Sequence, residues 1–264
     1  MAQTRRVGVL GHGAIGAVVA RCLADGGVVG AELSAVGLRK QRDLGDLPVM
    51  TVSDMIDASD LVVEVGGQPV LAEWGRTILD HGRDLLTVSI GALADDAIFE
   101  QLTTSGPGRL HICTGAIGGI DMIRAAAAMG PITSARITSS KKPAGLVQPT
   151  MSPEEAERVR SLTERTVLFE GDIRTLVGQF PASTNIAAAL ALAVGDWDIV
   201  CGTVVADPAA TVSTHIIEVS GEAGDYRFEM RHRPSPNNPR SSAMVPWSVI
   251  RALRDLCDPS WTFV

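Results

Sequence analysis

Three spaced glycines near the start of the chain constrain its fold more than any other feature. Gly11, Gly13 and Gly16 follow a strand-like apolar run, residues 5–10, and open a segment with apolar residues at helical spacing. In such a strand–turn–helix, the first glycine permits a tight turn, the second lets a ligand approach the backbone, and the third lets the helix pack closely on the strand. The free N–H groups at the start of the helix then attract phosphate. The pattern predicts a dinucleotide-binding turn, although tight structural turns use the same residues. The predicted cofactor contacts are Gly11, Gly13, Ala14, Ile15 and Gly16.

Beyond this turn, short apolar runs typical of buried parallel strands alternate with amphipathic stretches. The expected strands are residues 5–10, 31–37, 60–65 and 84–89, and the expected helices are residues 14–23, 70–81 and 92–102. This alternation predicts a doubly wound parallel sheet with right-handed crossovers.

The alternation breaks at residues 105–108, Ser-Gly-Pro-Gly, which we interpret as a domain boundary before a strand at 109–113. From Asp198 onward the apolar periodicity changes to two, which predicts antiparallel strands. Residues 233–239 are too rich in proline for regular structure, and a last helix, 242–256, is expected to return to the first domain. The expected fold is therefore α/β. It comprises a Rossmann-type domain, residues 1–108 plus 240–264, and a second α/β domain, residues 109–239, with a mixed or antiparallel-leaning sheet.

Composition excludes several classes of partner. The chain has 264 residues and a formal net charge of −7, with no block of basic residues, which argues against nucleic acid. No apolar run reaches the ~18 residues of a membrane span, and the charged start lacks the apolar core of a signal peptide, so we expect no membrane and a cytoplasmic protein. The four cysteines show no Cys-x-x-Cys pair, so no metal site is expected.

The end of the second strand bears on cofactor choice. A site that prefers NAD usually has an acid there, to bind the ribose 2′-hydroxyl, but this chain continues Gly37-Leu38-Arg39-Lys40. Arg39 and Lys40 favour the 2′-phosphate of NADP, with NAD still accepted, unless both are ordinary loop residues.

Further motifs occur in order along most of the chain. They are Val63-Glu64, Ser-Ile-Gly-Ala-Leu-Ala-Asp at 89–95, Gly-Ala-Ile-Gly-Gly at 115–119, Phe180-Pro181-Ala182 with Asn185, and Asp207-Pro208 leading to His215. Together with the glycine turn they resemble the L-aspartate dehydrogenase family. The resemblance implies oxidation of aspartate to iminosuccinate with NAD or NADP, a link to NAD biosynthesis, cofactor contacts at Ala116 and Asn185, and a catalytic role for His215. The chain departs from the family pattern at Ser140-Lys141, at Cys113-Thr114 and at Ser213, which border the expected substrate pocket.

The chemistry that this resemblance implies needs particular side chains. A hydride leaves the α-carbon only when the amine is neutral, so a base that works near neutral pH is required, and histidine is the natural choice. Of the five histidines, His215 lies just after a loop that enters a strand, where a side chain can face a cleft. The two substrate carboxylates need cations. Candidates are Lys141 with Lys142, or Arg231 with Arg233, although adjacent basic residues are more often a solvated surface pair.

Two alternative functions stay open. A related imine or oxo-acid reductase of the dihydrodipicolinate type is weakened because its His-His and Pro-Ser-Gly-Thr motifs are absent. A non-catalytic NAD(P)-sensing protein is the other alternative, because a fold does not by itself imply catalysis. We expect a small-molecule substrate and a homodimer.

Overall fold

The computed structural model describes residues 4–181, 184–235, 238–258 and 260. The chain forms two compact units. Unit 1 comprises Met1–Gly115 and Val245–Val264, and unit 2 comprises Ala116–Met244. Each unit contains its own main sheet.

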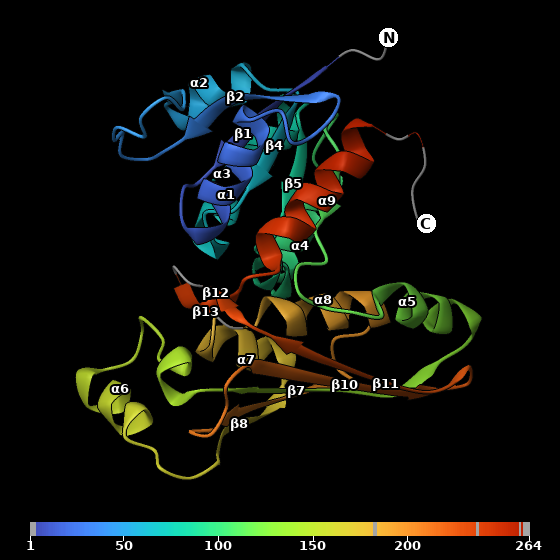
Figure 1. The fold of residues 1–264 in the computed structure, drawn as a ribbon. Helices are drawn as coiled ribbons and strands as arrows, with labels where there is room; N and C mark the ends of the chain where they lie inside the picture. The colour runs from blue at the N-terminus through green and yellow to red at the C-terminus, as the bar shows by residue number, and fades with distance from the viewer. Residues whose placement is uncertain (1–3, 182–183, 236–237, 259, 261–264) are drawn as a thin grey trace. The chain divides into compact units, whose positions relative to one another are not determined.

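Unit 1 is built on a six-stranded parallel sheet in the order β3-β2-β1-β4-β5-β6 (Figure 1). The strands are β1 Arg5–Leu10, β2 Ala31–Gly37, β3 Val49–Met50, β4 Leu61–Glu64, β5 Asp84–Thr87 and β6 Leu110–Ile112. Every neighbouring pair is parallel. This is the Rossmann strand order, and the order in which strands are added reverses between β1 and β4, where such sheets bind their ligands. The predicted doubly wound sheet is confirmed.

Helices cover both faces of this sheet. They are α1 Ala14–Ala24, α2 Val52–Asp57, α3 Gln68–Asp80, α4 Asp96–Thr104 and α9 Val245–Cys257, with a 3₁₀ turn, η1, at Ile90–Ala94. Helices α1 and α9 pack together, and α9 adds Val249 and Leu253 to the core that α1 forms with the strands. On the other face α2 approaches so closely that a Cβ on Gly8 would lie 2.1 Å from the Met55 sulfur. Helix α9 therefore belongs to the first sheet although it comes last in the chain.

Unit 2 is built on a five-stranded mixed sheet in the order β11-β10-β7-β9-β8. The strands are β7 Ile132–Lys141, β8 Thr166–Asp172, β9 Val200–Ala206, β10 Ser213–Gly221 and β11 Gly224–His232. Only β7 and β9 are parallel, and the other three pairings are antiparallel. The mixed, antiparallel-leaning sheet expected from the sequence is confirmed.

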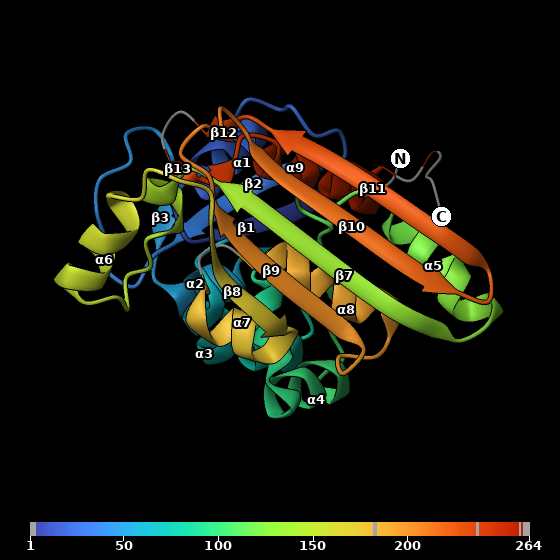
Figure 2. The same ribbon diagram turned by 90° about the horizontal axis from the view of Figure 1, so that it is seen from below.

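One face of the second sheet is covered by helices α5, α7 and α8 (Figures 1 and 2). The helices and 3₁₀ turn of this unit are α5 Ile120–Met129, η2 Pro143–Leu146, α6 Pro153–Arg160, α7 Ile173–Gln179 and α8 Asn185–Val194. Side chains alternate along a strand, and on β10 the buried ones are His215, Ile217 and Val219. Because helices bury only this face, His215 points toward the covered side of the sheet.

The expectation for residues 109–113 was wrong. This strand does not open the second unit, because β6 pairs in parallel with β5 and completes the first sheet. The stretch before it is the connection from α4, and it packs tightly, since a Cβ on Gly108 would lie 2.1 Å from the Arg83 carbonyl oxygen. Glycine and proline therefore mark a tight crossover here, and the units divide after Gly115.

Other boundaries also differ. The helix expected at 92–102 is split at Asp95, whose side chain accepts hydrogen bonds from Ala97 N and Ile98 N and starts α4 as its N-cap. The proline-rich stretch after β11 contains regular structure, because β12 Pro234–Ser235 pairs with β13 Asn238–Ser242, while residues 236 and 237 between them lie outside the described residues. Short elements β3, α2 and α7 had no periodicity long enough to predict them.

Candidate active site

The predicted glycine turn joins β1 to α1, and each glycine has a distinct steric reason. Gly11 has a φ of 104°, a left-handed conformation that favours glycine, and a Cβ on it would lie 2.8 Å from the Gly66 Cα. A Cβ on Gly16 would lie 2.1 Å from the Gly11 carbonyl oxygen. A Cβ on Gly13 would meet nothing within 4 Å. Gly11 and Gly16 are therefore required by packing, whereas Gly13 leaves open space beside the turn.

This turn fits the phosphates of a dinucleotide. Gly13 is the N-cap of α1 and has no side chain to occupy the helix N–H groups, and the first turn of α1 carries no acidic residue. The residues predicted to contact the cofactor here, Ala14 and Ile15 among them, thus surround a helix N-terminus at the carboxyl end of the sheet, where anions bind.

The basic residues after β2 differ in their surroundings. Arg39 is exposed and lies 3.8 Å from the Glu73 carboxylate, and Lys40 is also exposed. Arg42, which the sequence analysis did not select, donates from Nη2 to the carbonyl oxygen of His12 at 2.6 Å and lies 3.2 Å from its Nδ1. Desolvation, together with the charge of Arg42, lowers the pKa of His12. Arg42 is therefore the basic residue that contacts the glycine turn itself.

In unit 2, three polar side chains gather on the covered face of the sheet. His215 of β10 lies directly opposite Ser139 of β7 in the antiparallel register, and the Ser139 Oγ is 2.8 Å from the His215 Nδ1. Lys141, two residues further along β7, lies on the same face. All three are buried, with 7% of Ser139, 6% of Lys141 and 5% of His215 exposed. Buried polar groups of this kind are costly and mark functional sites.

Burial controls the charges of this cluster. Burial first, and then the nearby charges of Lys141 and His232, lower the pKa of His215 to about 3. Burial also lowers the pKa of Lys141 to about 8. The imidazole is thus neutral at physiological pH, and the lysine exchanges its proton near neutrality.

His232, at the end of β11, connects the cluster to the Gly-Ala-Ile-Gly-Gly motif. Its ring centroid lies 6.0 Å from that of His215, and its Nε2 lies 2.8 Å from the carbonyl oxygen of Ala116. Sequence reasoning missed both Ser139 and His232. The only available signal was alternation along the strands. Ser139 lies two residues before Lys141, and His232 lies on the covered face of its own strand.

The other predicted residues lie as follows. Lys142 is exposed, unlike Lys141, and both Arg231 and Arg233 are exposed. Asn185 is the first residue of α8, behind an N-cap at Thr184, so it is not the cap itself. Of the Phe180-Pro181-Ala182 motif, Ala182 lies outside the described residues.

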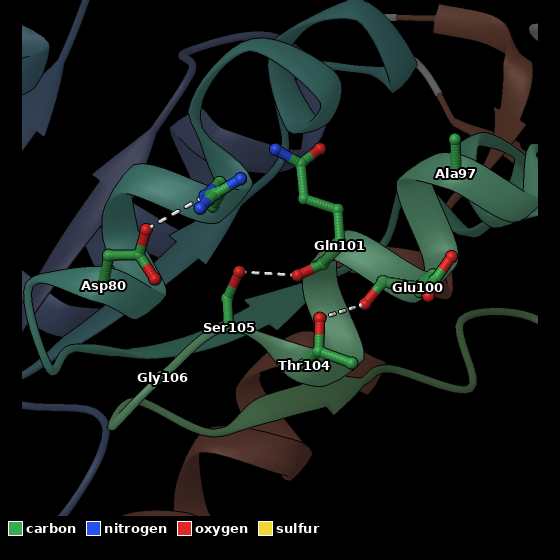
Figure 3. A pocket seen from close by; sticks show the side chains of 8 residues that line it. Asp80, Ala97, Glu100, Gln101, Thr104, Ser105 and Gly106 are labelled. Atoms are coloured by element: carbon green, nitrogen blue, oxygen red, sulfur yellow. Dashed lines mark hydrogen bonds and ion pairs between the residues drawn. The ribbon is translucent and has the colours of Figure 1, made fainter.

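A surface hollow between α3 and α4 does not resemble an active site (Figure 3). Four of its polar side chains bond locally: Arg76 pairs with Asp80, and the hydroxyls of Thr104 and Ser105 donate to carbonyl oxygens one turn back.

Comparison with known proteins identifies the family. Residues 121–256 match the family described as aspartate dehydrogenase, C-terminal, and residues 11–106 match the NAD-binding domain of homoserine dehydrogenase. The L-aspartate dehydrogenase of Methanosarcina mazei is 33% identical over 96% of this chain and 97% of its own length, and that of Ruegeria pomeroyi is 36% identical over 94% and 91%. This chain belongs to the L-aspartate dehydrogenase family.

A solved structure agrees with this family assignment. The crystal structure of aspartate dehydrogenase from Thermotoga maritima has a TM-score of 0.73 and 25% identity to this chain, and it covers 98% of this chain and 99% of its own. An archaeal homoserine dehydrogenase solved with NADPH shares the fold, with a TM-score of 0.56. The NAD-binding match falls on the first sheet, and the C-terminal match includes the second sheet.

Two further classes of site, membrane spans and metal clusters, are absent from the described residues. No helix in this part of the chain is both long and apolar enough to cross a membrane. Nor do three or more His, Cys, Asp or Glu side chains come together there as metal ligands. Cys113 is buried, and burial raises the pKa of its thiol to about 11, so it is a core residue rather than a nucleophile.

Proposed function

We propose that this protein is an NAD(P)-dependent dehydrogenase that interconverts L-aspartate and iminosuccinate. Curated relatives over nearly its whole length are L-aspartate dehydrogenases. The observation that carries the proposal is the buried pairing of His215 with Ser139 next to Lys141, because a neutral imidazole and a cation are the groups that this reaction needs. A protein that only senses the cofactor has no use for so costly a cluster.

His215 is the proposed base. Aspartate binds with a protonated amine, which must lose a proton before the Cα–H bond breaks and the C=N bond forms. In the tautomer in which Nδ1–H of His215 donates to Ser139 Oγ, Nε2 is left unprotonated and takes that proton. When bound, the pyridine nucleotide supplies the hydride acceptor.

Lys141 is the proposed partner of a substrate carboxylate. Its ammonium group is destabilised by burial, so a bound carboxylate restores the favourable charge balance and raises the pKa of Lys141. The same negative charge also favours the protonated form of His215, so substrate binding makes His215 a stronger base. Exposed Lys142 lacks these surroundings.

We further propose a preference for NADP, with NAD accepted. No acid follows β2 to repel a 2′-phosphate, and Arg42, anchored on the carbonyl oxygen of His12, presents a guanidinium beside the turn. Arg39 has an acidic neighbour, Glu73, which weakens the expected attraction of Arg39 for the 2′-phosphate.

Initial rates of the purified protein test the function. We expect reduction of NADP⁺ and NAD⁺ with L-aspartate, and at least about 10²-fold lower kcat/KM with L-glutamate, L-alanine and D-aspartate. Nucleotide binding without aspartate-dependent reduction would overturn the proposal in favour of a sensor, and turnover of a cyclic imine but not of aspartate or iminosuccinate would favour a dihydrodipicolinate-type reductase. The expected homodimer remains a prediction, which light scattering would test.

A further inference from the structure

Glu64 is a completely buried carboxyl group at the end of β4. It lies beside Leu10 of β1 and opposite Thr87 of β5 in the parallel register. Leu10 is the residue before Gly11, so Glu64 lies at the carboxyl edge of the sheet, next to the glycine turn. Leu61 and Val63 belong to the core beneath α1 and α9, so alternation puts Glu64 on the opposite face.

Four donors converge on this carboxyl group. Its Oε1 accepts hydrogen bonds from Gly66 N at 2.7 Å, Gly67 N at 2.9 Å and Ser89 Oγ at 3.0 Å. Its Oε2 accepts from Thr87 Oγ1 at 2.6 Å. Thr87 Oγ1 in turn accepts from Ser89 N at 3.0 Å. Burial raises the pKa of Glu64, and these four hydrogen bonds oppose that rise.

The donors belong to two loops, and both loops leave the carboxyl edge of the sheet. Gly66 and Gly67 form the connection from β4 to α3, and Ser89 precedes η1 after β5. Gly66 also supports the glycine turn, because a Cβ on Gly11 would lie 2.8 Å from its Cα. Glu64 therefore ties together the β4–α3 loop, the β5–η1 loop and, through Gly66, the turn between β1 and α1.

The arrangement requires a side-chain oxygen acceptor at position 64. Gly67 has a φ of 102° and is the N-cap of α3, and Glu64 accepts from the N–H groups of Gly66 and Gly67, which lead into the helix. No ion pair among the described residues includes Glu64, so backbone and hydroxyl dipoles alone balance it. A buried acceptor with four donors persists only where those groups must be held in place.

We propose that Glu64 is a positioning residue for the pyridine nucleotide: it fixes Gly66, Gly67 and Ser89 as the walls against which the cofactor binds. The cofactor crevice of a Rossmann sheet lies outside the carboxyl ends of β1 and β4, and these are the loops that border it. The proposal rests on nucleotide binding by unit 1, and not on which amino acid is oxidised.

The test compares Glu64→Ala with Val62→Ala. Val62 is buried on β4 two residues before Glu64, so it faces the same side, and it contacts neither loop through a side-chain hydrogen bond. We expect Glu64→Ala to raise the Kd for NADPH, measured by nucleotide fluorescence without amino acid, by at least about 10-fold. Both substitutions should lower Tm by a similar amount, but Val62→Ala should change the Kd for NADPH by less than about 2-fold.

Two further measurements separate positioning from folding. Glu64→Gln should keep Kd within about 3-fold of wild type, since its amide oxygen still accepts from Gly66, Gly67 and Ser89 and its amide nitrogen donates to Thr87 Oγ1. In the cofactor-free protein, hydrogen exchange at residues 65–68 should speed up at least about 10-fold in Glu64→Ala, while exchange in α1 stays unchanged. The proposal is overturned if Glu64→Ala binds NADPH like wild type, or if Val62→Ala loses as much affinity. A protein that binds NADPH normally but does not oxidise aspartate would refute the proposed function alone.

Discussion

Ser139 and His215 face each other across β7 and β10, with the serine Oγ 2.8 Å from the histidine Nδ1. A hydrogen bond at one ring nitrogen fixes the ring orientation and the tautomer, and so determines which nitrogen is available for chemistry. Both side chains are buried. We therefore expect Nε2 of His215 to be the reactive atom, with Nδ1–H donating to Ser139.

Removal of the base should abolish most of the turnover. We expect His215→Ala to lower kcat for aspartate oxidation by roughly 10²–10⁴-fold, because proton transfer by a positioned base contributes about that much. The Kd for NADPH should stay within about 2-fold. His81→Ala, an exposed residue at the end of α3, is the control and should match wild type. An unchanged kcat in His215→Ala would disprove the assignment.

Loss of the hydroxyl that orients the ring should give a smaller effect of a different kind. We expect Ser139→Ala to reduce kcat by about 10-fold and to shift the acidic limb of the pH–rate profile, because His215 loses its Nδ1 partner. Ser140→Ala changes a neighbouring residue that faces the other side of β7 and should leave both quantities unchanged. Equal effects of the two substitutions would show that Ser139 acts only through packing.

The pKa of Lys141 predicts that aspartate binding weakens at alkaline pH. Its pKa of about 8 means that the ammonium is protonated below that pH and increasingly neutral above it. kcat/KM for aspartate should therefore fall as pH rises through about 8. Lys141→Met should raise KM by at least about 10-fold and remove this limb, whereas Lys142→Met should do neither, because Lys142 is exposed. A limb that persists in Lys141→Met belongs to another group.

The buried Lys141 should also lower the free energy of unfolding. Burial depresses the pKa of Lys141 below its ordinary value of 10.5, so between about pH 8 and 10.5 the unfolded chain binds a proton that the folded protein does not. Stability therefore rises with pH through that window, and this gain should be absent from Lys141→Met. At pH 7 we expect the free energy of unfolding of Lys141→Met to exceed that of wild type by on the order of 1–3 kcal/mol. The variant should nevertheless be less active. Urea melts at pH 7 and 9.5 measure both effects, and a less stable Lys141→Met would contradict them.

Arg39 and Arg42, which follow β2, should differ in their effect on cofactor preference. We expect Arg42→Ala to lower kcat/KM for NADP⁺ by about 10-fold or more and that for NAD⁺ by less than about 3-fold, because only NADP⁺ carries the 2′-phosphate. Arg39→Ala should have the smaller effect, since Glu73 already lies near its guanidinium. If Arg42→Ala lowers both values equally, Arg42 only supports the turn through His12.

The sequence was sufficient where a local rule has one solution. Gly11 at a φ of 104° and Gly16 against the Gly11 carbonyl are consequences of a strand that turns at once into a helix, so spacing alone identified the turn. The switch to period two after Asp198 likewise predicted the mixed second sheet. The sequence was insufficient at residues 105–108, where we interpreted glycine and proline as a domain boundary. Tight packing of Gly108 against Arg83 requires the same residues.

The sequence by itself determined the strand–turn–helix and the two-sheet architecture, because local backbone rules specify them, and the resemblance to the family's motifs led to the prediction of His215. Only the tertiary structure decided which charged groups matter. Lys141 and Lys142 are adjacent in the chain, yet Lys141 ends β7 buried on its covered face, whereas Lys142 lies just beyond the strand and is exposed. Ser139 with His215, Arg42 with His12, and Glu64 with Gly66 come together through strand register and loop packing, and pairwise distances of this kind are not encoded in any one segment.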